Sequence, residues 1–401
     1  MINHQSMWDA NPQRDKTVVI SDLHLGVDDR YTETQKNRAL LIEFLQRLEK
    51  TDDVKELVIA GDFLDAWFLP VDYPSYTDED QFYRDAAANN QAVIDALNHL
   101  IQSDMTVVYV AGNHDLTMKP ELLDELLPGI VQIHEKQGLG RYYTGKRKEI
   151  VIEHGHRYDA FSAPDTLTNR ELCGNDETVL PMGYFYARYG ATAYLEGYPK
   201  VEKDLPVITQ VPDPSDVDQY GAYLYYSILK GVSERCTPKV DLQDKVFDMH
   251  IAGFDDAYSY LDFYPAQQED GTISAPVLFK NIQRTWDERQ KLNDVKRPNS
   301  FIEAASGTLD SSYYTQKAVE EYLENPDEQV EVVVFGHTHT PGYCKTDMGK
   351  TYVNSGTWID HNLDDPDATC IFAVITSEDT DTVALYSYQA DGSLQTITKQ
   401  L

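Results

Sequence analysis

Two histidines spaced two residues apart, His337 and His339, form the first candidate metal-binding pair in this sequence. They follow Gly336, which ends an apolar run at 333–335 that is typical of a buried strand. Neutral imidazole is a common ligand of transition metals, and an extended or turning His-x-His segment can direct both rings at one small volume. Such a pair by itself is weak evidence, so the interpretation depends on ligands from other segments.

Three more groups of polar residues follow apolar runs at 17–20, 56–60 and 106–110. The stretches between these runs, 33–49 and 80–101, have the apolar spacing of helices. This order predicts parallel strands with right-handed crossovers, and open α/β sheets bind ligands at the carboxyl ends of such strands. The polar residues that follow the three runs include Asp22, His24, Asp62, Asp65, Asn113, His114 and Asp115.

A fourth group, His154-Gly155-His156, follows an apolar run at 149–152. The combined imidazole, carboxylate and amide donors suit manganese, iron, zinc or cobalt, and the lack of thiolate ligands argues against copper(I) or iron–sulfur centres. Two ions that share a carboxylate lie about 3.5–4 Å apart and can stabilise both the attacking and the leaving oxygen of an in-line displacement at phosphorus. A water between them is acidified, which makes hydroxide available near neutral pH.

Taken in chain order, these groups resemble the five sequence blocks of the calcineurin-like metallophosphoesterases. The resemblance implies an α/β fold, a four-layer α-β-β-α sandwich of two mixed sheets. It also implies a dinuclear-metal-dependent phosphoesterase that hydrolyses a phosphate ester or pyrophosphate bond by in-line attack of a metal-bridging hydroxide. The matching blocks are Asp22-Leu23-His24, Gly61-Asp62-Phe63-Leu64-Asp65, Gly112-Asn113-His114-Asp115, His154-Gly155-His156 and Gly336-His337-Thr338-His339.

The resemblance further implies which residues bind metal. Two divalent transition-metal ions are expected, manganese first, with iron, zinc, cobalt or nickel as alternatives. The fourth block contains a second histidine, His156, so the choice of His154 as its ligand stays open. The expected ligands are Asp22, His24 and His339 for one ion, Asn113, His154 and His337 for the other, and Asp62 as the bridge.

In the same family pattern, His114 is the acid that protonates the leaving oxygen, and Asp115 holds it in place. A histidine beside a metal ligand and next to a carboxylate suits that role, because it can be oriented and kept protonatable.

The segment 21–26 and the His-Gly block most resemble the branch that contains UDP-2,3-diacylglucosamine pyrophosphohydrolases. Those enzymes are shorter, however, and commonly have an acidic residue at the place of His156.

The 401-residue chain has a net charge of −33, which argues against an electrostatic grip on DNA, RNA or an anionic membrane. A nuclease is therefore disfavoured, and a small phosphorylated substrate is expected. Some members of the resembled superfamily have lost their metals and act as binding scaffolds. The complete ligand set disfavours that alternative here. Oligomeric state is open.

The cysteines are far apart and form no C-x-x-C pair, which favours reduced thiols and a cytoplasmic location. Residues 1–16 lack the apolar region of a signal peptide, and no apolar run is long enough to span a bilayer. The four cysteines are Cys173, Cys236, Cys344 and Cys370.

The sequence predicts a metallophosphoesterase core formed by 1–159 and 300–401 and a mostly helical, tyrosine-rich insertion at 160–299. The expected role of most of these tyrosines is helix packing. Because the insertion begins directly after the fourth block, we expect it to form a cap that sets substrate choice and supplies no metal ligand. Packing elsewhere, or an oligomer interface, is the alternative. The segment 354–358, which interrupts the last strands, is either a turn or a neighbour of the site.

Overall fold

The computed structural model describes residues 14–73, 76, 78–174, 178–199, 204–235, 239–308, 310–362, 368–378 and 381–401. Cys236 and most of the segment 1–16 lie outside these residues. The chain forms two compact units. The first unit comprises Met1–Ala66, Asp80–His156 and Ser311–Leu401, and the second comprises Trp67–Glu79 and Arg157–Asp310.

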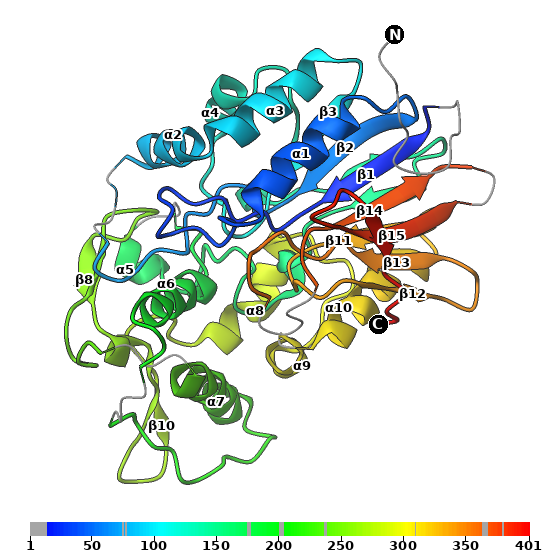
Figure 1. The fold of residues 1–401 in the computed structure, drawn as a ribbon. Coiled ribbons are helices and arrows are strands. Elements are labelled where there is room, and N and C mark those ends of the chain that lie inside the picture. The colour runs from blue at the N-terminus through cyan, green and yellow to red at the C-terminus, as the bar shows by residue number, and fades with distance from the viewer. Residues whose placement is uncertain are drawn as a thin grey trace. The chain divides into compact units, whose positions relative to one another are not determined.

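The first unit contains a seven-stranded sheet with the order β16-β15-β14-β1-β2-β3-β4 (Figure 1). Strands β1 to β4 are parallel, as the alternation of apolar runs and helical patterns predicts. The C-terminal strands β14, β15 and β16 are antiparallel to their neighbours. The strands are β1 (Lys16–Ile20), β2 (Val54–Ala60), β3 (Thr106–Val110), β4 (Val131–Ile133), β14 (Ile371–Thr376), β15 (Thr382–Tyr388) and β16 (Leu394–Thr396).

The second sheet of this unit has five strands in the order β12-β13-β11-β6-β5. Strand β11, which leads into the His-x-His pair, is central and parallel to both β6 and β13. The edge strands β5 and β12 are antiparallel to their neighbours, so this sheet is also mixed. The strands are β5 (Tyr142–Thr144), β6 (Ile150–Ile152), β11 (Val332–Phe335), β12 (Gly342–Lys345) and β13 (Thr351–Asn354).

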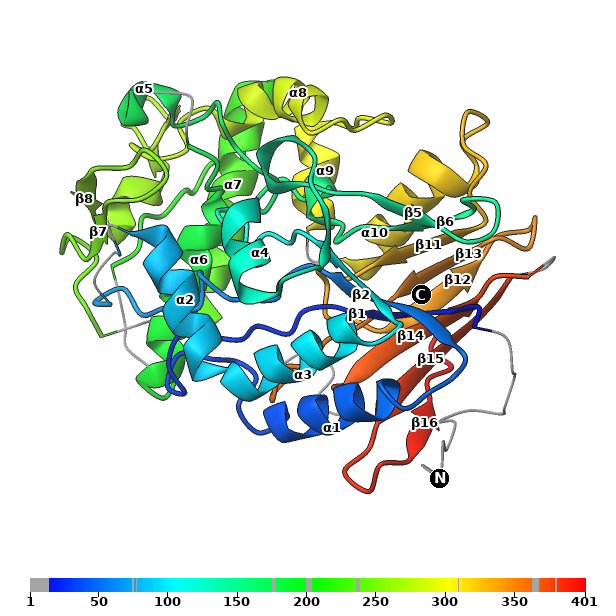
Figure 2. The ribbon, with the colours of Figure 1, turned by 90° about the horizontal axis from the view of Figure 1, so that it is seen from above.

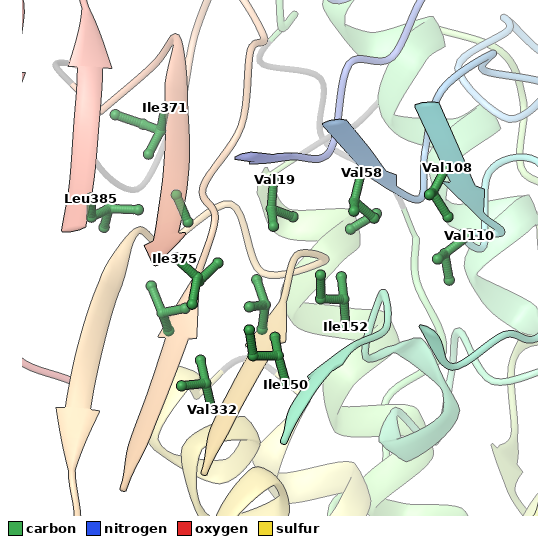
Figure 3. Packing of buried hydrophobic residues seen from close by; sticks show 14 residues of the cluster. Val19, Val58, Val108, Val110, Ile150, Ile152, Val332, Ile371, Ile375 and Leu385 are labelled. Atoms are coloured by element: carbon green, nitrogen blue, oxygen red, sulfur yellow. The ribbon is translucent and has the colours of Figure 1, made fainter. Parts of the chain in front are cut away.

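Branched aliphatic side chains from both sheets form one buried cluster between them (Figure 3). Alternate residues of a strand point to the same face, so pairs such as Val108 and Val110, or Ile150 and Ile152, enter the cluster together. These strands carry apolar residues on both faces, because helices cover the outer faces. Such burial contributes about 25 cal/mol per Å² of apolar surface and holds the two sheets face to face.

Helices α1 and α3 lie on the outer side of one sheet, and α10 lies on the outer side of the other (Figure 2). The predicted four-layer sandwich is confirmed. The pattern at 80–101 predicted one helix, but α2 ends and α3 begins at Asn90, whose buried side-chain amide donates to the Gly26 and Ala86 carbonyls. The helices are α1 (Arg38–Leu48), α2 (Glu79–Asn89), α3 (Gln91–Gln102), α4 (Pro120–Leu126) and α10 (Ser311–Ala318), which continues as a π-helix, η4 (Val319–Leu323). Short 3-10 turns lie at η1 (Lys136–Gly138) and η2 (His156–Tyr158).

The second unit combines helices with two short hairpins, where the sequence predicted mostly helix. Tyr184, Tyr189 and Tyr225 are buried within it, which confirms a packing role for these tyrosines, whereas Tyr194 and Tyr198 are exposed. The helices are α5 (Arg170–Cys173), α6 (Met182–Leu195), α7 (Val217–Arg235), α8 (Ile282–Leu292), α9 (Phe301–Gly307) and the 3-10 helix η3 (Tyr260–Phe263). The hairpins pair β7 (Phe247–Met249) with β8 (Asp256–Tyr258), and β9 (Ala266–Gln267) with β10 (Ile273–Ser274).

Arg188 on α6 explains why Trp67–Glu79 belongs to the second unit. Its buried guanidinium donates to four backbone carbonyls within 69–73 at 2.8–3.4 Å. One turn further along α6, the Thr192 hydroxyl accepts the Val71 N–H at 2.9 Å. Among the helices that the structure describes, none combines the length and apolar character needed to cross a bilayer.

Candidate metal centre

The expected metal ligands at the ends of β1, β2 and β11 share an unusual backbone conformation. Asp22, His24, Asp62, His337 and His339 all have φ between 43° and 68°, in the left-handed region that residues other than glycine rarely adopt. Each such residue costs on the order of 1 kcal/mol or more, and such strain tends to cluster at functional sites. The strained turns place the side chains just beyond the strand ends.

Two glycines leave room for these side chains. A Cβ at Gly336 would lie 2.5 Å from Asp22 Oδ2 and 2.6 Å from Ser21 Oγ. The lack of space beside Asp22 and Ser21 therefore requires glycine at position 336. Gly61 has φ of +90°, and a Cβ there would lie 2.4 Å from His154 Nδ1.

The first expected ligand group is assembled around Asp22. His339 Nε2 lies 3.2 Å from Asp22 Oδ1 and 3.1 Å from His24 Nε2. His24 Nε2 is 3.9 Å from the same Asp22 oxygen. Three residues from both ends of the chain therefore present ligating atoms to one small volume.

A second group of ligating atoms surrounds His154. Its Nε2 lies 3.0 Å from Asn113 Oδ1 and 3.2 Å from Asp62 Oδ2. Its Nδ1 is 2.8 Å from the Ala60 carbonyl oxygen, so Nδ1 carries a proton, and Nε2 is the nitrogen that faces Asn113 and Asp62. Asp62 Oδ2 is also 3.6 Å from His24 Nε2, so this one oxygen faces both groups.

His337 and His156 lie near His154 but outside the close groups of ligating atoms. The His337 ring centroid is 5.2 Å from that of His154, and its backbone N–H donates to both Asp22 oxygens at 3.1 Å. The His156 ring centroid lies 5.3 Å from that of His154. The close groups of His, Asp and Glu atoms found among the described residues include His154 but neither His156 nor His337.

The carboxylate that holds His114 is Asp65. His114 Nδ1 lies 2.8 Å from Asp65 Oδ1, and the other Asp65 oxygen lies 2.8 Å from His24 Nδ1. The sequence assigned this role to Asp115, and that assignment is wrong. The Asp115 oxygens instead accept the backbone N–H groups of Gly112 at 2.6 Å and Phe63 at 2.9 Å. The missed signal was the second aspartate of the Gly-Asp-x-x-Asp block, four residues after Gly61.

Two buried carboxylates at the centre require compensating positive charge. Asp22 is 0% exposed and Asp62 is 1% exposed, and neither has a lysine or arginine partner among the described residues. Burial by itself raises the pKa of Asp22, but His154 and His339 bring it below its ordinary value. Burial also raises the pKa of Asp62, but His154 and His114 outweigh burial and bring this pKa well below its usual range.

The histidines show the opposite effect. Burial lowers the pKa of His154, but Asp62 and Asp22 outweigh it and raise the pKa to about 9. The pKa of His24 is lowered by burial and raised well above its ordinary value by Asp65 and Glu33. A divalent cation among these groups would take the place of such protons, because metal ligands must be deprotonated. The donor set of carboxylate, imidazole and amide fits such ions.

The segment 354–357 lies beside this centre. The Asn354 side-chain amide donates to the Gly336 carbonyl at 2.6 Å and to Thr338 Oγ1 at 3.1 Å. The Thr357 hydroxyl donates to the Asp22 carbonyl at 3.0 Å. The sequence left open whether this segment is a simple turn or a neighbour of the site. The structure shows that it supports the backbone of two ligand loops.

Residues 16–191 match the family model described as calcineurin-like phosphoesterase. A structure of Vacuolar Protein Sorting 29 from Cryptosporidium parvum is 12% identical, with 96% of this chain and 97% of that chain covered and a TM-score of 0.30. A dimetal phosphatase from Danio rerio is 13% identical (96% and 99% covered, TM-score 0.36). A phosphopantetheinyl hydrolase from Mycobacterium tuberculosis is also 13% identical (86% and 91% covered, TM-score 0.29). Among curated proteins, none matches this sequence significantly. Residues 16–191 are thus similar to the calcineurin-like phosphoesterase domain, and this match supports a phosphoester hydrolase.

Proposed function

We propose that this protein hydrolyses a phosphate ester or pyrophosphate bond of a small phosphorylated compound with the help of two divalent metal ions. The observation that carries the proposal is the pair of buried carboxylates, Asp22 and Asp62, which face imidazole nitrogens at 3.2–3.9 Å. Neither carboxylate has a lysine or arginine partner among the described residues. Buried charges of this kind are usually paired or bind metals.

The close contacts support a division of the ligands between two ions. Ions held there would supply an acidified water and positive charge for the phosphoryl oxygens. Manganese is the ion to test first. Asp22, His24 and His339 would hold one ion, Asn113, His154 and His337 the other, and Asp62 would lie between them.

His114 is suited to donate a proton to the leaving oxygen. Its side chain is 15% exposed, whereas that of His24 is 1% exposed, so a substrate can reach His114. Burial lowers the pKa of His114, but Asp65 and Asp62 outweigh burial and raise the pKa above its ordinary value, which favours the protonated ring. With Nδ1 directed at Asp65, Nε2 remains to donate.

The net charge of −33 favours a small substrate over a nucleic acid, because a polyanion would be repelled. Within this class, the resemblance of 21–26 to the UDP-2,3-diacylglucosamine pyrophosphohydrolase branch makes a nucleotide-linked pyrophosphate the first specific candidate. A nucleotide-linked pyrophosphate should therefore be assayed beside phosphate esters.

The experiment is a hydrolysis panel with Mn²⁺-loaded protein on phosphomonoesters, phosphodiesters and pyrophosphates. We expect turnover of at least one class, its loss after chelation, and its return when Mn²⁺ is added back. Asp22→Asn serves as the inactive control. No hydrolysis of any class by protein that has bound its metals would overturn the proposal.

We further propose that the insertion 160–299 sets substrate choice. The chain passes into the second unit at Ala66/Trp67 and at His156/Arg157, so both crossings are covalently next to the second and fourth motifs. Replacing 160–299 by a Gly/Ser linker also removes Arg188 and Thr192, the partners of 69–73, so that stretch must be shortened too. If the variant binds metal and its relative rates across the panel are unchanged, the insertion has no role in selection.

A further inference from the structure

Helix α10 and the π-helix η4 that continues it contain an irregular turn beside the metal centre. The Glu324 N–H donates to the Val319 carbonyl at 2.8 Å, a bond that spans five residues where an α-helix spans four. This widened turn packs against β11, the strand that leads into the His337–His339 segment. Such π-turns are rare, and many of those that occur lie at functional sites, so this one calls for an explanation.

Tyr314 on α10 packs against one of the expected metal ligands. Its ring is buried, and its centroid lies 5.5 Å from that of the His337 ring, with the two planes 70° apart. This is the edge-to-face arrangement that aromatic rings prefer. Because the His337 ring lies outside the close groups of ligating atoms, its direction depends on the side chains packed against it.

Tyr322 on η4 supports the neighbouring strand end. Its buried hydroxyl donates to Glu153 Oε1 at 2.8 Å, and Glu153 immediately precedes His154 in the chain. The Glu153 N–H in turn donates to the Val334 carbonyl at 3.1 Å, and the Gly336 N–H donates to the His154 carbonyl at 3.1 Å. These bonds keep β6 and β11 paired up to their ligand loops. One helix therefore contacts both of the strand ends that carry these histidines.

The widened turn brings the two tyrosines to one face of the helix. They are eight residues apart, and eight steps of about 100° in a regular α-helix would leave their side chains about 80° apart. A turn that holds one extra residue removes about one step, so Tyr322 returns to within about 20° of Tyr314. Without it, a helix with Tyr314 against His337 would turn Tyr322 away from Glu153.

We propose that Tyr314 and Tyr322 are positioning residues for the ion assigned to Asn113, His154 and His337, and that the π-turn keeps them aligned. Tyr314 orients the His337 imidazole, and Tyr322 fixes the strand end before His154. The inference rests on the proposed function, because that function assigns both histidines to one ion. A helix that only packs on the sheet would affect both ions alike, or stability alone.

Tyr314→Leu and Tyr314→Phe form a matched pair, because phenylalanine keeps the ring and leucine does not. Calorimetry measures Mn²⁺ binding to the full-length protein, and electron paramagnetic resonance distinguishes a coupled pair of ions from a single ion. We expect Tyr314→Leu to weaken, about tenfold, the ion that His337→Ala loses, while the other ion and Tyr314→Phe are nearly unaffected. Equal weakening of both ions in Tyr314→Leu, or no weakening, would overturn the role of Tyr314.

Deletion of Glu320 removes the extra residue of the π-turn and should turn Tyr322 away from Glu153. We expect this variant and Tyr322→Phe to weaken the same ion about tenfold, while the circular dichroism spectrum is retained. Tyr322→Phe keeps the test decisive if the deletion variant does not fold. Unchanged binding of both ions in Tyr322→Phe would overturn the role of Tyr322.

The direction of the His337 ring is also measured without metal. In metal-free protein with ¹³C-labelled histidine, the His337 ring signal is identified by its absence in His337→Ala. It should move in Tyr314→Leu and move far less in Tyr314→Phe. An unchanged signal in Tyr314→Leu would overturn the inference even if two ions bind. If the signal moves as expected but the unaltered protein binds fewer than two ions, the two-ion proposal fails and the positioning of His337 stands.

Discussion

His24 and His114 lie with their ring centroids 4.6 Å apart and their planes 89° apart, and both rings bind the same carboxylate, that of Asp65. One is an expected metal ligand and the other is the expected acid. Asp65 is therefore a positioning residue for both, because its two oxygens contact the Nδ1 atoms of the two rings. A change at Asp65 should affect metal binding and proton donation together.

Asp65→Asn should weaken metal binding about 10–100-fold and lower turnover at saturating metal, because the amide cannot accept from both imidazoles. Calorimetric titration with Mn²⁺ and steady-state kinetics measure the two effects. Asp115→Asn is the matched control. It should destabilise folding by about 1–3 kcal/mol through the Gly112 and Phe63 N–H groups, with a smaller loss of turnover. An equal loss of turnover from both variants would support the original prediction that Asp115 holds His114 in place.

His114→Ala should retain its metals and lose about 10²–10⁴-fold in turnover on alkyl phosphates, whose leaving groups need protonation. The loss should be smaller on p-nitrophenyl phosphate, because nitrophenolate leaves without a proton. The comparison of kcat between the two substrates is the measurement. Identical losses on both would argue against proton donation by His114.

Loading with Mn²⁺ should give about two ions per chain by elemental analysis, because one Asp62 oxygen faces both ligand groups. Asp62→Asn should lower this ratio and the activity. His156→Ala should leave the ratio unchanged, while His154→Ala should reduce it. The reverse result for the two histidines would transfer the ligand role to His156.

Asn354→Asp should loosen the His337–His339 segment, because a carboxylate cannot donate to the Gly336 carbonyl. We expect metal affinity to fall about 10–100-fold, as for other residues that support ligands. Thr338→Ala, which removes the longer contact of the Asn354 amide and a long contact with the Thr340 N–H, should cost less. Metal titration of the folded variants is the measurement, and unchanged affinity in Asn354→Asp would contradict the role.

Glu56 should matter for stability rather than activity. Its buried carboxylate accepts hydroxyls from Thr17 of the first sheet at 2.7 Å and from Thr144 and Tyr142 of the second at 2.5 Å and 2.7 Å. Glu56→Ala should lower the free energy of unfolding by about 3 kcal/mol, and Glu56→Gln should cost less because it keeps the shape and one acceptor. Urea unfolding measures both. A loss of turnover per folded molecule would contradict a purely structural role.

The sequence by itself determined the order of the first unit's parallel strands and the residue types at the strand ends. Local periodicity is sufficient for this, because a β-branched run such as 106–110 forms a buried strand whichever partner it finds. The positions of Asp22, Asp62 and His339 at the carboxyl ends of strands follow from that order together with the parallel topology.

The tertiary structure decided which side chains meet. Asp65 and Asp115 are both buried motif aspartates, and only Asp115 is next to His114 in the sequence. The turn after β2 nevertheless directs Asp65 at the imidazole, while Asp115 faces backbone N–H groups. Likewise, Asn354 reaches Gly336 across 18 residues, and Arg188 reaches 69–73 across more than 110. Such pairings depend on side-chain direction in three dimensions, and sequence spacing carries no information about it.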